Sequence, residues 1–421
     1  MTAREARPVA VPGDKSLSHR ALMFAALARG TSRLSGVLES ADVRSTAECL
    51  RRLGVAVPPI APSMTVESGG VAALRNPEHD LDCGNSGTSA RLLAGIVAGA
   101  GRTARFVGDA SLSARPMKRV AEPLRRMGAT ITFEGGDGLP MRVVASRLHG
   151  LEWTSPSASA QVKSALLLAG LTSGSGVTVH EPSRSRDHTE RMLGALGAPV
   201  TVTGNSVALA AGAPPLAAFE FDVPGDPSSA AFFAAWALLT GTAIRTGAIS
   251  TNPTRTGFFA ALERMGARIE IEGAAERCGE PVGHVAVSGT LMRPLALGAS
   301  DVPSMIDELP LLACLAAYAP GETRVTGAAE LRVKESDRIA AVVSNLRAVG
   351  ADASELPDGF VVRGAQRPLA GRVTTHGDHR IAMGFGVLAA LAGNDIALDD
   401  PECVAVSFPG FWTELRRVAA A

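Results

Sequence analysis

The chain has 421 residues, of which 46% are hydrophobic, and its formal net charge at pH 7 is zero. This composition is typical of a globular protein with a sizeable core, and it argues against nucleic acid or a membrane surface as the partner. The longest apolar run, residues 230–239, is shorter than the ~18 residues that a membrane span needs. The five cysteines are scattered and form no CxxC motif, and the first residues lack a signal-peptide pattern. We therefore expect a cytoplasmic protein without a disulfide framework or a zinc site.

One signature recurs six times: a Leu, a large apolar residue three positions later, and then a Gly. Successive copies lie about 70 to 85 residues apart, which is a spacing typical of repeat architectures. The two apolar residues share a helix face, the Gly suits a left-handed cap, and alternating strand-like segments follow most copies. The sequence therefore predicts six units, each made of a helix, a Gly stop and a strand. The copies are residues 50–54, 124–128, 193–197, 262–266 and 346–350, with a degenerate sixth at 415–419.

A second repeat groups these units into two halves. The tripeptide Pro-Gly-Asp occurs at 12–14 and again at 224–226, and each copy opens an apolar helix pattern that ends near a Gly, Gly30 or Gly241. An Asp after such a turn can cap the helix that follows. We predict two domains, with hinges near 12–15 and 224–228. Residues 1–13 plus 226–421 would form one domain that holds both termini, and residues 14–225 would form the other.

The motif at residues 14–20, Asp-Lys-Ser-Leu-Ser-His-Arg, combines a helix start with hydroxyl and basic groups. Lys15 and Ser16 lie at the helix start and Arg20 one to two turns later, so backbone N–H groups and two cations could bind an anion. The alternative is a capped helix with a solvated polar end. The chain contains neither a P-loop motif nor a dinucleotide-binding GxGxxG motif.

Three further motifs suit a phosphorylated or polyhydroxylated ligand. Residues 83–91 form a Gly-rich turn that includes Gly87 and runs into a helix. Arg115 precedes a Pro, so its backbone is held extended. Residues 157–165 place Ser159, Ala160 and Gln161 at a helix start, and Arg186 begins a similar start at 186–190. Taken alone, residues 83–91 are better explained as a tight turn with a helix cap, and Arg115 as a solvated loop residue. For the starts at 157–165 and 186–190 the alternative is N-capping.

Acidic residues appear in the second half of the chain. Asp307 lies where an apolar helix begins, and residues 332–338 pack several charges together. If this segment is helical, Lys334 and Arg338 share a face while Glu335 points sideways. Residues 376–380, His-Gly-Asp-His-Arg, could bind a metal, although hydrogen-bonded structure is the commoner use of such a group.

Lysine is rare here, with four copies among 41 basic residues: Lys15, Lys118, Lys163 and Lys334. A retained lysine can mark a site that needs a compact ammonium, but chance survival on the surface explains any one of them alone equally well. Lys15 and Lys334 each lie in a dense polar motif, which favours the functional interpretation for these two.

The motifs recur at the starts of successive units, so the fold would gather them at one end of each domain. Asp307 and Glu335 would offer an acid/base pair among the gathered cations, which favour ionised carboxylates unless burial or substrate charge opposes this. The ligands would therefore be strongly anionic. The cations expected to line one cleft are Lys15, Arg20, Arg115, Arg186, Lys334, Arg338 and Arg380.

Eight motifs in order along nearly the whole chain resemble those of the enolpyruvyl transferases: PGDKSLSHR, GNSGTSAR, RPM, SASAQVKSALLLAG, RDHTE, DELPLL, RVKESDR and GDHRIAM. The resemblance implies an α/β fold of two similar domains, each of three βαβαββ-type units, with the active site in the cleft between them. It implies transfer of the enolpyruvyl group of phosphoenolpyruvate to the 5-hydroxyl of shikimate-3-phosphate with release of phosphate, a step of aromatic amino acid biosynthesis. It also implies a monomer that needs no cofactor or metal and is inhibited by glyphosate.

The resemblance also implies residue roles. Asp307 would accept the proton of the 5-hydroxyl, Glu335 would protonate the methylene carbon, and Lys334 would assist the leaving phosphate, with Lys15 beside both substrates. The implied shikimate-3-phosphate site is Lys15, Ser16, Arg20, Ser159, Ala160, Gln161, Arg186, Asp307 and Lys334. The implied phosphoenolpyruvate site is Lys15, Gly87, Arg115, Gln161, Arg338 and Arg380.

The sequence departs from the family pattern at three of these contacts. Val406 stands where enteric members carry a phosphoenolpyruvate-contacting Lys, Ala160 replaces a Ser, and Gly87 stands where glyphosate-tolerant relatives carry Ala. The sibling enzyme that acts on UDP-N-acetylglucosamine has a loop Cys where this chain has Ala110, which argues against that activity. A non-catalytic anion-binding scaffold is the other alternative, but it would gain nothing from Asp307 and Glu335.

Overall fold

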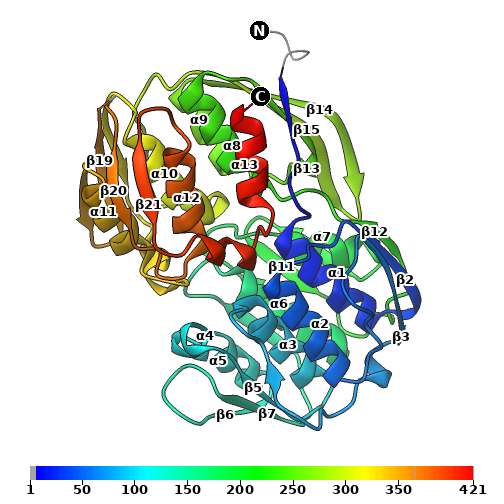
Figure 1. The fold of residues 1–421 in the computed structure, drawn as a ribbon. Coiled ribbons are helices and arrows are strands. Elements are labelled where there is room, and N and C mark those ends of the chain that lie inside the picture. The colour runs from blue at the N-terminus through cyan, green and yellow to red at the C-terminus, as the bar shows by residue number, and fades with distance from the viewer. Residues whose placement is uncertain (1–5, 366, 421) are drawn as a thin grey trace. The chain divides into compact units, whose positions relative to one another are not determined.

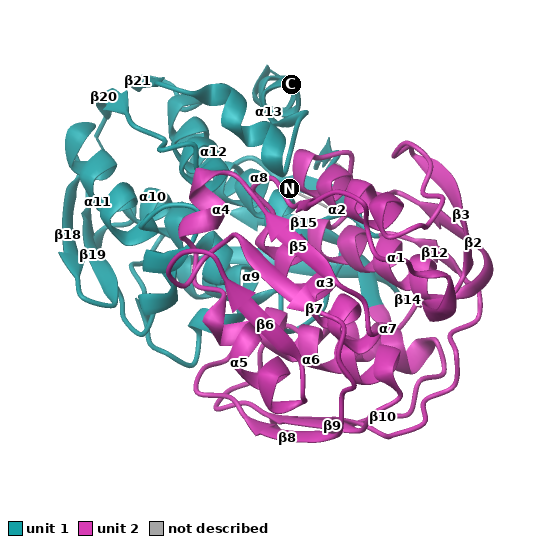
Figure 2. Ribbon diagram, turned by 90° about the horizontal axis from the view of Figure 1, so that it is seen from below, with its two compact units in different colours: residues 1–12, 224–275, 281–421 teal, residues 13–223, 276–280 magenta. Residues whose placement is uncertain are grey.

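The computed structural model describes residues 6–365 and 367–420 and divides into two compact units (Figure 2). Unit 1 comprises residues 1–12, 224–275 and 281–421, and unit 2 comprises residues 13–223 and 276–280. The short segment 276–280 was expected with the C-terminal domain, and this placement is wrong. Arg277 pairs with Asp222 at 2.5 Å and Glu280 Oε1 contacts His188 Nδ1 at 2.7 Å, so these side chains tie the segment to unit 2.

Unit 2 contains three sheets, with strand orders β12-β2-β3, β4-β5-β7-β6 and β10-β11-β9-β8 (Figure 1). Its strands are β2 (Arg29–Ser35), β3 (Ser63–Gly69), β4 (Leu81–Asp82), β5 (Ala104–Val107), β6 (Thr130–Phe133), β7 (Met141–Val144), β8 (Leu151–Thr154), β9 (Val177–His180), β10 (Val200–Thr203), β11 (Ser206–Leu209) and β12 (Glu220–Asp222). Its helices are α1 (Lys15–Leu27), α2 (Ala41–Arg52), α3 (Gly87–Gly99), α4 (Ala110–Ala114), α5 (Lys118–Arg126), α6 (Ala160–Ser173) and α7 (His188–Ala195).

The described residues of unit 1 also form three sheets, with strand orders β1-β13-β15-β14, β16-β17-β19-β18 and β20-β21. Its strands are β1 (Arg7–Val9), β13 (Ile244–Ser250), β14 (Ala267–Arg277), β15 (Glu280–Gly289), β16 (Ala296–Leu297), β17 (Gly321–Val325), β18 (Asp352–Leu356), β19 (Gly359–Gly364), β20 (Ala370–Val373) and β21 (Asp395–Leu398); β14 and β15 meet at the segment assigned to unit 2. Its helices are α8 (Pro227–Thr240), α9 (Gly257–Met265), α10 (Leu309–Ala316), α11 (Arg338–Ala348), α12 (His379–Ala389) and α13 (Phe411–Ala420).

The six sheets share one pairing pattern. Each begins with a parallel pair at one edge: β12–β2, β4–β5, β8–β9, β1–β13, β16–β17 and β20–β21. In five of them an antiparallel strand follows. The parallel pair β1–β13 brings the N-terminal strand into unit 1. The fold is therefore a mixed α/β architecture of two similar halves, each with three repeats.

The predicted Gly stops end helices in the structure. The signatures at 50–54, 124–128, 193–197, 262–266 and 346–350 each lie at a helix C-terminus, and every Gly in them has a positive φ, from 82° to 122°. Gly241 caps α8 with φ 69°. The first apolar helix pattern was expected to end near Gly30, and α1 ends at Leu27, shortly before this glycine, which lies in β2.

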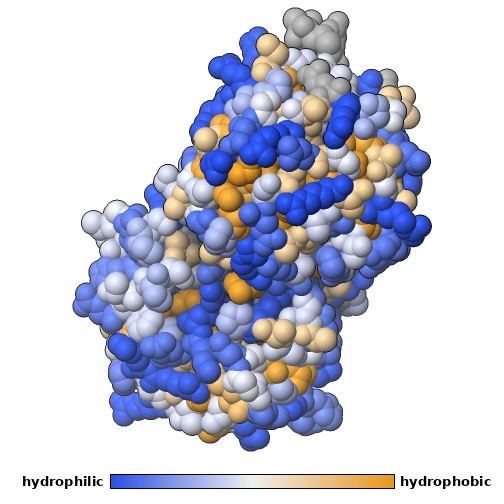
Figure 3. All heavy atoms as spheres, turned by 90° about the vertical axis from the view of Figure 1, so that its left-hand side faces the viewer, coloured by the Kyte–Doolittle hydropathy of each residue, from blue (hydrophilic) through white to orange (hydrophobic). Residues whose placement is uncertain are grey.

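Each unit has its own hydrophobic core around buried helices. In unit 2 the helix α3 packs mainly against α6, and in unit 1 the helices α8, α10 and α12 pack against one another. Large apolar side chains are rarely exposed among the described residues, and the face in Figure 3 shows hydrophobic groups scattered among hydrophilic ones. None of the described helices combines the length and apolar character needed to cross a membrane.

Gly194 in α7 and Gly197 just after its C-terminus give a matched stability test. Gly197 has φ 82° and Gly194 does not have a positive φ, and a Cβ at either position would meet no atom within 4 Å. We expect Gly197→Ala to lower the free energy of unfolding by about 1–2 kcal/mol, because the left-handed conformation is unfavourable for Ala. Gly194→Ala should raise it by roughly 0.5–1 kcal/mol, because Ala is the better helix former. Urea unfolding of both variants measures the difference, and equal shifts would contradict the prediction.

Candidate active site

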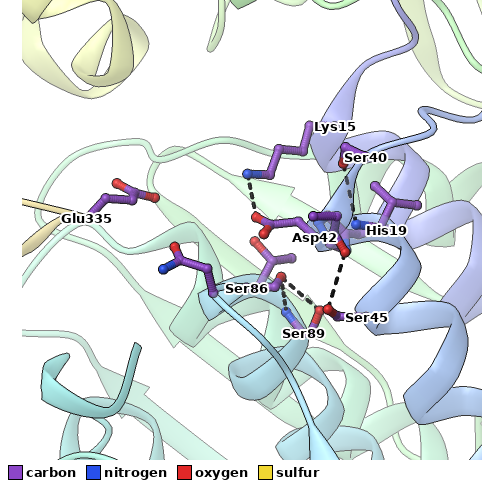
Figure 4. A network of polar contacts seen from close by, with 12 residues as sticks. Lys15, His19, Ser40, Asp42, Ser45, Ser86, Ser89 and Glu335 are labelled. Carbon is purple, nitrogen blue, oxygen red and sulfur yellow. Dashed lines mark hydrogen bonds and ion pairs between the residues drawn. The ribbon is translucent and has the colours of Figure 1, made fainter. Parts of the chain in front are cut away.

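The start of α1 carries a buried ion pair. Asp14 caps the helix by accepting a hydrogen bond from Leu17 N at 2.8 Å. Lys15, the first helical residue, points toward Asp42 of α2, with 2.5 Å between Nζ and Oδ2 (Figure 4). The Asp42 side chain is only 7% exposed, whereas that of Lys15 is 17% exposed. The ammonium is thus held by a buried carboxylate while part of the Lys15 side chain stays exposed.

One turn further along α1, Arg20 is buried among neutral groups. Its Nε donates to Thr189 Oγ1 at 2.8 Å, its Nη2 to Ser164 Oγ at 2.9 Å, and its Nη1 to the Ser16 carbonyl at 2.9 Å. Burial lowers the pKa of Arg20 to about 10, although nearby carboxylates, Glu190 first among them, oppose this. The guanidinium therefore remains charged at neutral pH, and its neutral hydrogen-bond partners leave this charge able to attract an anion.

A chain of polar side chains connects α1 and α2 to the start of α3. His19 Nδ1 lies 2.7 Å from Thr46 Oγ1, which lies 2.6 Å from Ser89 Oγ. Ser89 Oγ in turn donates to Ser86 Oγ, the N-cap of α3, at 2.8 Å (Figure 4). Burial, and then Lys15 and Arg20, lower the pKa of His19 well below its ordinary value. A neutral imidazole therefore helps to fix the helix starts that present the predicted motifs.

The starts of α3 and α6 also meet. Gln161 accepts a 2.5 Å hydrogen bond from Arg91 Nη1 at its Oε1 and donates from Nε2 to Thr88 Oγ1 at 3.1 Å. A Cβ on Gly87 would lie 3.2 Å from Arg91 Nη1 and 3.6 Å from Arg115 Nη1. Gly87 therefore lies directly beside two guanidinium groups.

Arg115 has the extended backbone expected before Pro116, with φ −78° and ψ 143°. Its Nη2 donates to Asn85 Oδ1 at 2.6 Å and to Ser111 Oγ at 3.2 Å. The side chain is thus aimed at the Gly-rich turn before α3.

The other unit 2 candidates lie at helix starts. Ser159 is the N-cap of α6 and accepts from Val162 N at 3.5 Å, a long contact that leaves the hydroxyl weakly engaged. Ala160 is the first residue of α6, and Arg186 is half-buried two residues before α7. Unit 2 thus brings the candidate residues of α1, α3 and α6 together through hydrogen bonds.

In unit 1, Arg338 at the start of α11 is surrounded by carboxylates. Its side chain is 1% exposed, and its Nη2 lies 2.6 Å from Glu335 Oε2. Its Nη1 lies 3.2 Å from Asp307 Oδ1, and its Nε donates to Asp378 Oδ2 at 2.8 Å. Burial lowers the pKa of Arg338, but Asp378, Glu335 and Asp307 raise it more, to above the ordinary arginine range. This guanidinium is a permanent cation that holds both predicted acid/base groups.

The predicted helix over Lys334, Glu335 and Arg338 does not exist in that form. Lys334 ends a 3-10 turn (Ala329–Val333), Asp337 is the N-cap, and α11 begins at Arg338. Asp337 accepts hydrogen bonds from Ile339 N and Ala340 N, and this capping starts the helix after the charged segment. The turn still brings Lys334 Nζ to 3.5 Å from Asp307 Oδ1, the carboxylate that Arg338 also contacts.

Arg380 and the neighbouring histidines complete the unit 1 candidates. Arg380 is buried in the first turn of α12, and its guanidinium carbon lies 5.8 Å from the centre of the Phe232 ring. Asp378 caps α12 through Arg380 N at 2.9 Å. No group of three His, Cys, Asp or Glu residues in the described part of the chain could hold a metal ion.

Several residues in these clusters were missed as candidates from the sequence. Asp42 and Thr46 carried no signal, because each looks like an ordinary residue of an amphipathic helix. Arg91, Thr189 and Asp378 lay inside the quoted motifs, where their spacing to a helix start was the available signal. Direct contacts with candidate side chains are made by Asp42, Arg91, Thr189 and Asp378, whereas Thr46 contacts His19 in the motif at 14–20.

Sequence and structural relatives identify the family of this chain. The family model for EPSP synthase (3-phosphoshikimate 1-carboxyvinyltransferase) matches residues 4–415. A 3-phosphoshikimate 1-carboxyvinyltransferase of Synechococcus sp. (strain CC9605) is 48% identical, with 97% of this chain and 95% of the relative covered. One from Bacillus subtilis (strain 168) is 43% identical, with 97% and 96% covered. A structure of EPSP synthase from Acinetobacter baumannii superposes with a TM-score of 0.84 at 40% identity, covering 98% of this chain and 96% of that one. The chain therefore belongs to the EPSP synthase family.

Proposed function

We propose that this chain transfers the enolpyruvyl group of phosphoenolpyruvate to the 5-hydroxyl of shikimate-3-phosphate and releases phosphate. The hydroxyl adds to C2 of the enolpyruvate, and phosphate then leaves a tetrahedral intermediate. The observation that carries the proposal is the contact of Arg338 with both Asp307 and Glu335, because an anion-binding scaffold has no use for two carboxylates at a buried cation.

Shikimate-3-phosphate is assigned to the cationic and hydroxyl groups at the starts of α1 and α6. Arg20 supports this role because its hydrogen-bond partners are neutral, so its charge remains available to a phosphate or carboxylate. Lys334 and Asp307 would contribute from unit 1. The assigned residues of unit 2 are Lys15, Ser16, Arg20, Ser159, Ala160, Gln161 and Arg186.

Phosphoenolpyruvate is assigned to Gly87, Arg115 and Gln161 of unit 2, to Arg338 and Arg380 of unit 1, and to Lys15. The Gly-rich turn before α3 supports this, because it places two guanidinium groups beside a position without a Cβ. Val406, which stands where enteric members carry a Lys, lies in a 3-10 turn (Pro401–Val406). We assign no other side chain to the role of that Lys.

Asp307 and Glu335 are assigned the proton transfers. Asp307 contacts Lys334 and Arg338, which are the partners expected of a carboxylate that accepts the 5-hydroxyl proton. Glu335 must carry a proton to deliver it to the methylene carbon, and its ion pair with Arg338 opposes this. The negative charge of bound phosphoenolpyruvate would offset the effect of Arg338 and favour the protonated form of Glu335.

A coupled phosphate-release assay tests the activity. Purified protein should release phosphate from phosphoenolpyruvate only when shikimate-3-phosphate is present. Release with UDP-N-acetylglucosamine instead would support the sibling activity, and no release with either acceptor would support a binding scaffold.

We further propose glyphosate as an inhibitor that occupies the phosphoenolpyruvate site. The methyl group added by Gly87→Ala should cost glyphosate, the longer ligand, more binding free energy than it costs phosphoenolpyruvate. Each ~1.4 kcal/mol of this difference should weaken inhibition by about tenfold. The added methyl would lie 3.2 Å from Arg91 Nη1, and overpacking of this kind costs roughly 1–3 kcal/mol.

The measurement is the glyphosate Ki and the phosphoenolpyruvate KM for wild type and Gly87→Ala. Gly135→Ala is the control, because a Cβ there meets no atom within 4 Å. Equal fractional changes in Ki and KM would show that Gly87 does not discriminate between the two ligands.

A further inference from the structure

Lys163 is a buried lysine that the proposed reaction leaves without a role. It lies in the first turn of α6, and its side chain is 1% exposed. Its Nζ lies 2.7 Å from Glu181 Oε2 and 2.8 Å from Glu190 Oε1, and both glutamate side chains are 2% exposed. Burying three charged groups is costly and often stabilises a protein less than an apolar cluster would. This arrangement therefore calls for a reason beyond stability.

The ion pair between Lys163 and Glu190 lies beside the hydroxyl groups that hold Arg20. Ser164 follows Lys163 on α6, and Thr189 precedes Glu190 on α7. The two hydroxyl oxygens lie 2.7 Å apart, and each accepts a hydrogen bond from Arg20. Two neighbouring bridges thus join α6 to α7, one neutral and one charged, and the neutral bridge seats Arg20.

Arg20 and the nearby carboxylate of Glu190 have different hydrogen-bond partners. Among the nearby carboxylates, Glu190 raises the pKa of Arg20 the most. The hydrogen-bond partners of Arg20 are nevertheless two hydroxyl groups and a carbonyl. Burial raises the pKa of Glu190, and its contact with Lys163 opposes that rise. Lys163 therefore keeps a carboxylate near Arg20 engaged without letting it form the direct ion pair that the charges favour.

We propose that Lys163 is a positioning residue for substrate binding: by engaging Glu190, it keeps this carboxylate from pairing with Arg20 and leaves the guanidinium to the anionic substrate. The inference rests on the proposed function, because it takes shikimate-3-phosphate as the ligand of Arg20. Without Lys163, the Glu190 carboxylate would turn to the nearest cation and compete with the substrate. Lys163 contacts no reacting group, so its loss should weaken binding and spare turnover.

The first test is Lys163→Met, which keeps the length of the side chain and removes its charge. Titration calorimetry with shikimate-3-phosphate should show Kd about tenfold or more above wild type. At saturating substrate, kcat should stay within about threefold of wild type, because the lost interaction is made before the chemical step. An unchanged Kd would overturn the inference.

Two double variants separate the charge of Glu190 from a general loss of structure. Lys163→Met combined with Glu190→Gln should bind within about threefold of wild type, because no carboxylate is left to capture Arg20. Lys163→Met combined with Glu181→Gln loses the same two charges but keeps Glu190, so its binding should stay weak. Equal affinities in the two double variants would overturn the inference, and this comparison stands even if the single variant does not fold.

The wild-type titration distinguishes this inference from the function on which it rests. If wild type does not bind shikimate-3-phosphate, the proposed function fails and the inference fails with it. If wild type binds and Lys163→Met binds equally well, only the role of Lys163 is wrong.

Discussion

Replacing Glu335 by Gln is expected to lower kcat by about 10²- to 10⁴-fold, the usual contribution of a general acid or base. Gln keeps the shape of the side chain but has no proton to give to the methylene carbon. The KM values for both substrates should change little, because Arg338 keeps its contacts with Asp307 and Asp378. Steady-state kinetics with the phosphate-release assay gives both constants.

The control for this variant is Glu322→Gln in the same unit. Glu322 pairs with Arg324 at 2.9 Å, and both side chains are more than a third exposed, so its loss should leave kcat unchanged. A raised KM with normal kcat in Glu335→Gln would make Glu335 a binding residue. The proposed proton transfer would then be wrong.

The repeat architecture could be predicted from the sequence because its signals are local. A Leu, an apolar residue and a Gly at fixed spacing encode a helix stop within one turn, and the observed positive φ of Gly128 and Gly350 follows from that pattern. The starts of α1, α6 and α8 were readable for the same reason, because a capping side chain lies next to the helix that it caps.

The partners of the candidate residues could not be predicted in this way, because they come from distant parts of the chain. Asp42 pairs with Lys15 from another helix, and Asp378 reaches Arg338 across 40 positions. Helical spacing also misled the reading of Lys334 and Arg338. They meet at Asp307 because a capped turn brings them there, not because they share a helix face. Periodicity encodes a helix face but not which carboxylate a cation will meet.

Arg338 illustrates why these distant contacts carry the largest stability effects. Asp378 is fully buried, and its two oxygens contact Arg338 Nε at 2.8 Å and Nη2 at 3.2 Å. Removing one partner of a buried pair leaves an uncompensated charge and typically costs about 3–5 kcal/mol. Asp307 and Glu335 remain beside Arg338 in such a variant, so the lower end of this range applies.

We expect Asp378→Asn to lower the free energy of unfolding by about 3 kcal/mol and to reduce kcat as well. Asn caps a helix nearly as well as Asp, so the start of α12 is preserved and the loss reports the ion pair. Activity should fall because Arg338, which contacts Asp307 and Glu335, loses its ion pair with Asp378. Asp352→Asn is the matched control: Asp352 lies 3.7 Å from Arg363 with both side chains more than half exposed, so a change of about 0–1 kcal/mol is expected. Urea unfolding monitored by circular dichroism gives both values. Equally small changes in the two variants would mean that the buried charge of Asp378 does not fix Arg338, and the geometry of the acid/base pair would need another explanation.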